Sequence, residues 1–155
     1  MSSTMILGTT DPYQWPQTIP ATILLVEDEP TVREVTRQAL EMGGYRMLEA
    51  SSPEEAAHIA SNSCTEIDLL LTDVVMPGMS GPELARRMSE VRFGLVTLFM
   101  TGYTECEVAR AVHGTLQHHI QKPFTVNVLL SRVARALATR WEPGSGIRPA
   151  QFPSP

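Results

Sequence analysis

The sequence predicts an α/β protein in which a parallel β-sheet is covered by helices on both faces. Short apolar segments alternate five times with segments that have the periodicity of helices. Residues 22–26 (TILLV) and 67–71 (IDLLL) are almost continuously apolar, which is typical of strands buried on both faces of a sheet. The connections are short, which favours helices that pack directly back onto the sheet.

Each expected element has a local signal. The expected strands are 22–26, 45–50, 67–73, 95–100 and 118–121, and the expected helices are 30–42, 52–61, 80–91, 104–113 and 125–140. Pro30 suits the first turn of its helix because the missing N–H has no partner there, and Gly43-Gly44 ends that helix. The next three helices each begin at a Ser or Thr followed three residues later by Glu, which is the spacing of a capping box.

Length and composition indicate one domain of ordinary globular character. The 155 residues suffice for one hydrophobic core. A net charge of −5 and a pI near 5.3 argue against nucleic acid or an anionic membrane as the main partner. No apolar run approaches the roughly 18 residues that span a bilayer, and residues 1–10 do not resemble a signal peptide. Cys64 and Cys106 form no CxxC pair, so we expect reduced thiols and a cytoplasmic location.

The two ends of the chain differ in composition from its middle. Seven of the twelve prolines fall in residues 1–20 and 141–155. We expect residues 1–20 to be a flexible leader or linker and residues 141–155 to be a disordered tail rich in proline and glycine. The folded domain is expected over residues 21–140.

Polar and charged residues follow four of the five expected strands. Glu27 and Asp28 follow the first strand, Asp73 ends the third, Thr101 follows the fourth and Lys122 follows the fifth. The carboxyl ends of parallel strands meet at one edge of a sheet, where open α/β sheets bind their ligands. Each residue alone has an ordinary explanation as a helix cap, turn residue or surface lysine. Their conjunction favours a functional site.

The chemistry of this residue set points to a metal ion and a phosphoryl group. Three carboxylates in one pocket raise one another's pKa unless a cation neutralises them. Oxygen ligands without His or Cys suit Mg²⁺, which favours a phosphoryl group as a further ligand. Lys122 supplies a positive charge for a phosphate oxygen and Thr101 a hydroxyl donor. Asp73, the most central carboxylate, is the expected acceptor in a phosphoryl transfer.

Four motifs carry a resemblance to a known family. LLVEDEP, LLLTDVVMPGMSGPEL, FMTGY and QKPF resemble the receiver domain of two-component response regulators over residues 21–140. FMTGY and QKPF are especially similar to receivers of hybrid histidine kinases. The resemblance implies a flavodoxin-like (CheY-like) three-layer sandwich, with a five-stranded parallel sheet of order 2-1-3-4-5 and five helices.

The resemblance also assigns roles to the residues at the strand ends. It implies that Asp73 accepts a phosphoryl group from the histidine of a kinase or phosphotransfer domain. Mg²⁺ would be held by Asp28, Asp73 and the main-chain carbonyl of Val75, with Glu27 acting through water.

Two further positions match the family's switch and phosphate-binding residues. Thr101 matches the switch hydroxyl, and Lys122 matches the phosphate-binding lysine. The Lys122–Pro123 peptide bond is expected to be cis.

The sequence departs from the family pattern at two places. His119 stands where receivers usually carry Tyr or Phe, three residues before the lysine, and residues 113–118 look one residue longer than the usual loop. A histidine there would swing inward like the aromatic, make the switch sensitive to pH, or mark its loss. We also hypothesise that bulky Val75 and Tyr103 screen the site from water and slow dephosphorylation.

Several functions compete on these observations. The first is a signalling module in which phosphorylation changes the surface around residues 104–140 and so the binding of an unknown downstream protein. A hydrolase with an aspartyl-phosphate intermediate lacks an evident second acid, and a flavin protein would not place Glu-Asp-Glu after its first strand. Because His119 replaces the usual aromatic residue, a further hypothesis is an adaptor that binds its partner independently of phosphorylation. The four histidines lack the spacing of a metal site. The exposed faces of the last two expected helices are a candidate surface for a homodimer.

Overall fold

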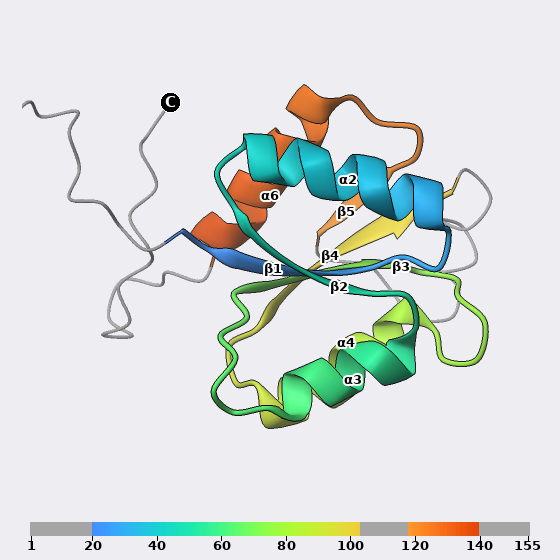
Figure 1. Cartoon of the computed structure of the whole chain (residues 1–155), viewed down its shortest axis with the longest axis vertical. Coiled ribbons are helices and arrows are strands. Elements are labelled where there is room, and N and C mark those ends of the chain that lie inside the picture. Colours follow the sequence, from blue (N-terminus) through green and yellow to red (C-terminus); the bar gives the residue numbers. More distant parts are fainter. Residues whose placement is uncertain (1–19, 103–117, 140–155) are drawn as a thin grey trace, which may run out of the picture.

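The computed structural model describes residues 20–102 and 118–139, in which strands and helices alternate (Figure 1). The elements are β1 (Thr22–Val26), α2 (Pro30–Met42), β2 (Arg46–Ala50), α3 (Pro53–Ser61), β3 (Leu69–Asp73), α4 (Gly81–Val91), β4 (Val96–Thr101), β5 (His119–Gln121) and α6 (Val126–Ala138). Their ends agree with the expected elements to within one or two residues. The expected helix 104–113, most of the leader and the tail from residue 141 lie outside the described residues.

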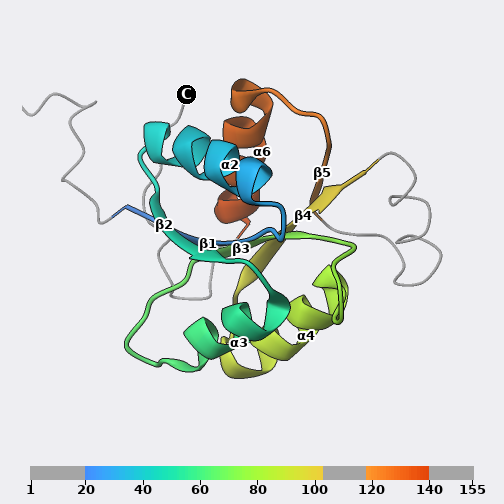
Figure 2. The same cartoon turned by 45° about the vertical axis from the view of Figure 1, so that its right-hand side comes forward.

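The five strands form one parallel sheet in the order β2-β1-β3-β4-β5, which confirms the predicted topology. Helices α2 and α6 cover one face of the sheet, and α3 and α4 cover the other (Figures 1 and 2). Three layers therefore result, as predicted. Within the described residues, no helix is both long and apolar enough to cross a membrane.

The central strands are buried on both faces, as their continuous apolar sequences predict. Ile23 and Leu25 of β1 pack into the core under α2 and α6, whereas Leu24 and Val26 pack into the core under α3 and α4. This division follows from the alternation of side chains along a strand. All four side chains are fully inaccessible to solvent. A sheet enclosed in this way leaves its edges as the places where polar groups can gather.

The helix caps fix how the chain leaves the sheet. Glu29, and not Glu27 or Asp28, caps α2 by accepting hydrogen bonds from the backbone N–H groups of Thr31 and Val32. The alternative in which Glu27 and Asp28 serve only as helix caps is therefore wrong. At the other end of α2, Gly44 adopts a positive φ of 89°, which glycine tolerates best.

Two of the three predicted capping boxes lie in the described residues, and in each only the hydrogen bond to the capping serine forms. Ser52 and Ser80 each accept a hydrogen bond from the backbone N–H three residues later, as predicted. The Glu55 carboxylate, however, bonds to the N–H and hydroxyl of Ser51, and the Glu83 carboxylate pairs with Arg87.

Candidate functional site

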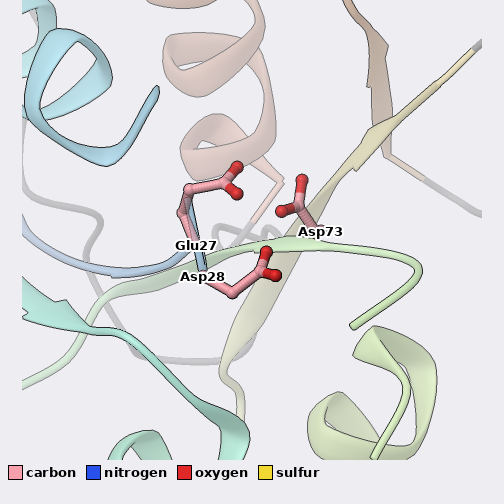
Figure 3. A group of neighbouring side chains, drawn as sticks. All are labelled: Glu27, Asp28 and Asp73. Carbon is pink, nitrogen blue, oxygen red and sulfur yellow. The ribbon is translucent and has the colours of Figure 1, made fainter. Parts of the chain in front are cut away.

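The carboxyl edge of the sheet brings three acidic side chains together. Glu27 and Asp28 follow β1 directly, and Asp73 is the last residue of β3, the strand paired with β1. Figure 3 shows the three carboxylates pointing into one space from these two strand ends. One oxygen of each lies within 4.8 Å of the others. We call these three residues, together with Lys122, the acidic site.

Lys122 neutralises the two buried members of the acidic site. Its Nζ lies 2.9 Å from Glu27 Oε2 and 2.5 Å from Asp73 Oδ1. Glu27 is 2% exposed and Asp73 4% exposed, whereas Asp28 lies open to solvent. Asp73 Oδ1 is fully enclosed and accepts no hydrogen bond of regular geometry, so its contact with Lys122 is an ion pair without hydrogen-bond directionality. A buried charge needs such a partner.

The burial and the neighbours of these groups separate their pKa values. Burial, together with a hydrogen bond to Glu27, raises the pKa of Asp73 to about 8. Burial would also raise the pKa of Glu27, but hydrogen bonds with Asp73 and Lys122 outweigh it, so this pKa lies below its usual value. The negative charge therefore resides on Glu27 and the shared proton on Asp73. The sequence predicted raised pKa values unless a cation neutralises the carboxylates: the pKa of Asp73 is raised, whereas the cation Lys122 helps to lower the pKa of Glu27.

Other residues position the backbone of the acidic site, and the sequence reading did not single out these roles. Arg33 of α2 donates a 2.7 Å hydrogen bond from Nη1 to the carbonyl oxygen of Glu27, which braces the loop after β1. The buried hydroxyl of Thr72 donates to the carbonyl oxygen of Asp73 at 3.1 Å. Gly81 begins α4 against the same carbonyl, where a Cβ would overlap the oxygen. The sequence signal that could have revealed the role of Gly81 is its position between the capping serine and a proline.

Thr101 joins the site through the backbone and not through its hydroxyl. It is fully buried at the end of β4, and its carbonyl oxygen accepts a 2.8 Å hydrogen bond from the N–H of Lys122. Its hydroxyl donates to the carbonyl oxygen of Ile120 at 3.5 Å. The Lys122–Pro123 bond is cis, as expected. The sequence-predicted residues at the strand ends thus gather at one edge, with the Thr101 hydroxyl bonded to the backbone of β5.

The remaining predicted positions differ in their exposure to solvent. Val75 is 54% exposed in the loop after β3. His119 is half-buried at the start of β5. Tyr103, the second residue expected to screen the site, lies outside the described residues, and so does most of the loop 113–118.

The acidic site fits a hard metal cation. Its donors are carboxylate oxygens only, two from a buried pair and one from an exposed residue that solvent can reach. Such oxygen ligands suit Mg²⁺ or a similar ion that retains water molecules. A cation would also offset the burial and the Glu27 charge that together raise the pKa of Asp73. The site is therefore an acidic pocket that could hold a metal ion.

Fold and site together define a doubly wound α/β protein with a carboxylate pocket at the carboxyl edge of its sheet. The profile of the response regulator receiver domain family matches residues 23–134. The chain belongs to this family, and so is a signalling domain of the two-component type.

Individual relatives agree with this assignment. The chain is 37% identical over 118 residues to the sensor kinase CckA of Brucella abortus, covering 76% of this chain and 12% of that protein. It is 34% identical over 134 residues to the phosphate regulon regulator PhoB of Pseudomonas aeruginosa, covering 84% of this chain and 57% of that protein. The chain thus spans only a part of each of these curated relatives.

A solved structure shares the fold. The response regulator TrrA of Thermotoga maritima, crystallised in complex with Mg²⁺ and BeF, is 28% identical and superposes with a TM-score of 0.65. The match covers 76% of this chain and 99% of that one.

Proposed function

We propose that this domain accepts a phosphoryl group on Asp73 from the histidine of a kinase or phosphotransfer domain. The observation that carries the proposal is the convergence of three carboxylates and Lys122 at the carboxyl edge of the sheet. The family assignment supports a histidine-containing donor. Beyond this Mg²⁺-dependent self-phosphorylation and the hydrolysis that reverses it, we propose no enzymatic activity.

Asp73 acts as the nucleophile in the proposed transfer. Its carboxylate oxygen attacks the phosphorus atom, a P–O bond forms, and the P–N bond to the donor imidazole breaks. The leaving nitrogen takes the electron pair and then a proton from solvent. Because its pKa is raised to about 8, Asp73 must first lose the proton that it shares with Glu27.

A bound Mg²⁺ ion and Lys122 would assist the transfer. Glu27, Asp28, Asp73 and the carbonyl of Val75 would hold Mg²⁺, which when bound neutralises charge on the phosphoryl oxygens. Support for this ion comes from the oxygen-only ligand set and from the related receiver crystallised with Mg²⁺ and BeF. Lys122 is already within ion-pair distance of Asp73 and so stands ready to pair with a phosphoryl oxygen.

The proposed consequence of phosphorylation is a change of protein-interaction surface. The Thr101 hydroxyl would leave the Ile120 carbonyl and donate to the phosphoryl group, so that β4 and β5 adjust together. The cytoplasm is the proposed location, supported by the free thiol of Cys64 and by a donor of the kinase type.

The test is intact-mass spectrometry after incubation with acetyl phosphate, with and without Mg²⁺. We expect the wild-type chain to gain one phosphoryl group only when Mg²⁺ is present, and Asp73→Asn to gain none. Asp68→Asn is the matched control, since Asp68 precedes β3 at the opposite edge of the sheet. An adduct that persists in Asp73→Asn would refute Asp73 as the acceptor. No adduct in any sample, including rapid-quench samples, would favour an adaptor that acts independently of phosphorylation.

A further inference from the structure

A second charged site lies at the outer edge of the sheet, between β5 and α6. Here the surface encloses a cavity of about 340 Å³ lined by Leu98, His118, His119, Arg132 and Arg135. We call it the basic cavity. In Figure 2 β5 lies at the end of the sheet farthest from β2, and α6 covers the sheet next to α2.

The two arginines of the basic cavity have no acidic partner within the part of the chain that the structure describes. Arg132 and Arg135 are exposed, and neither forms an ion pair with residues 20–102 or 118–139. Elsewhere on the helices the arrangement differs, since Arg86 and Arg87 of α4 each pair with a glutamate one turn away. The sequence of α6 contains no Asp or Glu at all.

His118 contributes a ring nitrogen to the same cavity. His118 Nε2 lies 3.3 Å from the hydroxyl oxygen of Thr139, at the end of α6. That contact ties the start of β5 to α6 and so gives the cavity a defined wall. Two guanidinium groups that have no acidic partner among the described residues line this cavity, and each can donate two parallel hydrogen bonds to one carboxylate.

Charge decides between the possible occupants. A symmetric pairing of two copies through this face would bring the same arginines toward each other, which like-charge repulsion opposes. Nucleic acid and anionic lipid are recognised by broad basic surfaces, whereas the described lining of this cavity offers two arginines only, so both are disfavoured. A protein segment rich in Asp and Glu fits the small, locally cationic cavity best.

We propose that the basic cavity is a docking site for an acidic segment of a different protein. The inference deepens the proposed function by naming the chemistry of a partner for the surface near β5. Binding itself needs no phosphoryl group, so it is tested on the unphosphorylated chain and again in Asp73→Asn. Failure of phosphorylation and failure of docking are thereby separate results.

The experiment measures binding of a short fluorescent peptide of alternating Asp and Glu to the full chain at low ionic strength. A peptide of alternating Asn and Gln serves as the uncharged probe. We expect the acidic peptide to bind, and Arg132→Gln combined with Arg135→Gln to weaken binding about tenfold or more. Arg86→Gln combined with Arg87→Gln removes the same charge from the opposite layer and should change the affinity less than about twofold.

Amide chemical shifts of the labelled chain locate the peptide. We expect the largest shifts at His118, His119 and along α6. Equal losses in the two double variants, or shifts centred away from β5 and α6, would overturn the proposal. So would binding of an oligonucleotide or an anionic vesicle at this cavity in place of the acidic peptide. Circular dichroism of both double variants confirms that a lost interaction does not reflect unfolding.

Discussion

The acidic site and the basic cavity both concentrate charge of one sign, but they differ in how that charge is compensated. In the acidic site Lys122 lies within 2.9 Å of Glu27 and 2.5 Å of Asp73, and both carboxyl groups are buried. In the basic cavity Arg132 and Arg135 are exposed and unpaired among the described residues. Buried charges must be compensated within the fold, whereas exposed charges are solvated by water and remain available to a binding partner. The first arrangement suits chemistry and the second suits recognition.

The largest expected effect comes from the packing behind Asp73. Gly81→Ala places a methyl group against the carbonyl oxygen of Asp73, so either α4 or the end of β3 must move. We expect a loss of about 3 kcal/mol in the free energy of unfolding, measured by urea denaturation. Ser89→Ala, on the exposed side of α4, should cost less than about 0.5 kcal/mol. Equal stabilities for Gly81→Ala and wild type would show that Asp73 does not depend on this contact.

Removing the positively charged side chains of the acidic site and of the basic cavity tests the difference between the two sites directly. Lys122→Gln leaves the buried Glu27 carboxylate without its cation and should cost about 2 kcal/mol at pH 7. Arg132→Gln combined with Arg135→Gln relieves like-charge repulsion on an exposed face and should change stability by less than about 0.5 kcal/mol. Thermal and urea unfolding measure both. Equal losses in the free energy of unfolding would contradict the stated difference between the acidic site and the basic cavity.

A third expected effect depends on the proton that Asp73 holds. Its pKa of about 8 in the folded chain compares with an ordinary 3.8, so in this window the folded chain binds a proton that the unfolded chain has released. Stability without metal should therefore fall as the pH rises from 6.5 to 8, by about 1–2 kcal/mol. The lowered pKa values of Glu27 and His118 act below this window.

Asp73→Asn is the matched variant for this pH dependence. It removes the titrating carboxyl and keeps the other groups, so we expect its stability to vary little between pH 6.5 and 8. Both proteins are unfolded with urea in the presence of a chelator. Parallel pH profiles for wild type and Asp73→Asn would mean that Asp73 does not carry the proton.

Sequence reasoning located the acidic site well because topology alone decides where strands end. Once the sheet is parallel, Asp73 and the residues after β1 and β5 meet at one edge, whatever the details of packing. The bracing hydrogen bond from Arg33 was not predictable in this way, because it depends on how α2 leaves the sheet. The basic cavity was missed for a similar reason. His118 and Arg135 are far apart in sequence, and only the packing of α6 against β5 brings them together.

Arg33 offers a smaller test of the bracing around the acidic site. Arg33→Ala removes the hydrogen bond to the Glu27 carbonyl and should cost about 1 kcal/mol. It should also weaken Mg²⁺ binding about tenfold, as loss of a residue that orients metal ligands commonly does. Mg²⁺ titration followed by amide chemical shifts measures this, with Arg86→Ala on the exposed face of α4 as control. Unchanged Mg²⁺ affinity in Arg33→Ala would leave Arg33 with a purely structural role.

The smallest expected effect concerns the exposed rim of the acidic site. Val75 is 54% exposed in the loop that follows Asp73, so its side chain can shield an aspartyl phosphate only from one side. Val75→Ala should therefore speed hydrolysis of the phosphorylated chain about two- to threefold, because water then reaches the phosphorus more freely. The rate is followed by mass spectrometry after removal of acetyl phosphate. Val91→Ala, an equally conservative change at the far end of α4, should leave the rate unchanged. If both variants hydrolyse at the wild-type rate, shielding by Val75 is excluded, and the lifetime of the phosphoryl group must be set by Lys122 and the buried walls of the site.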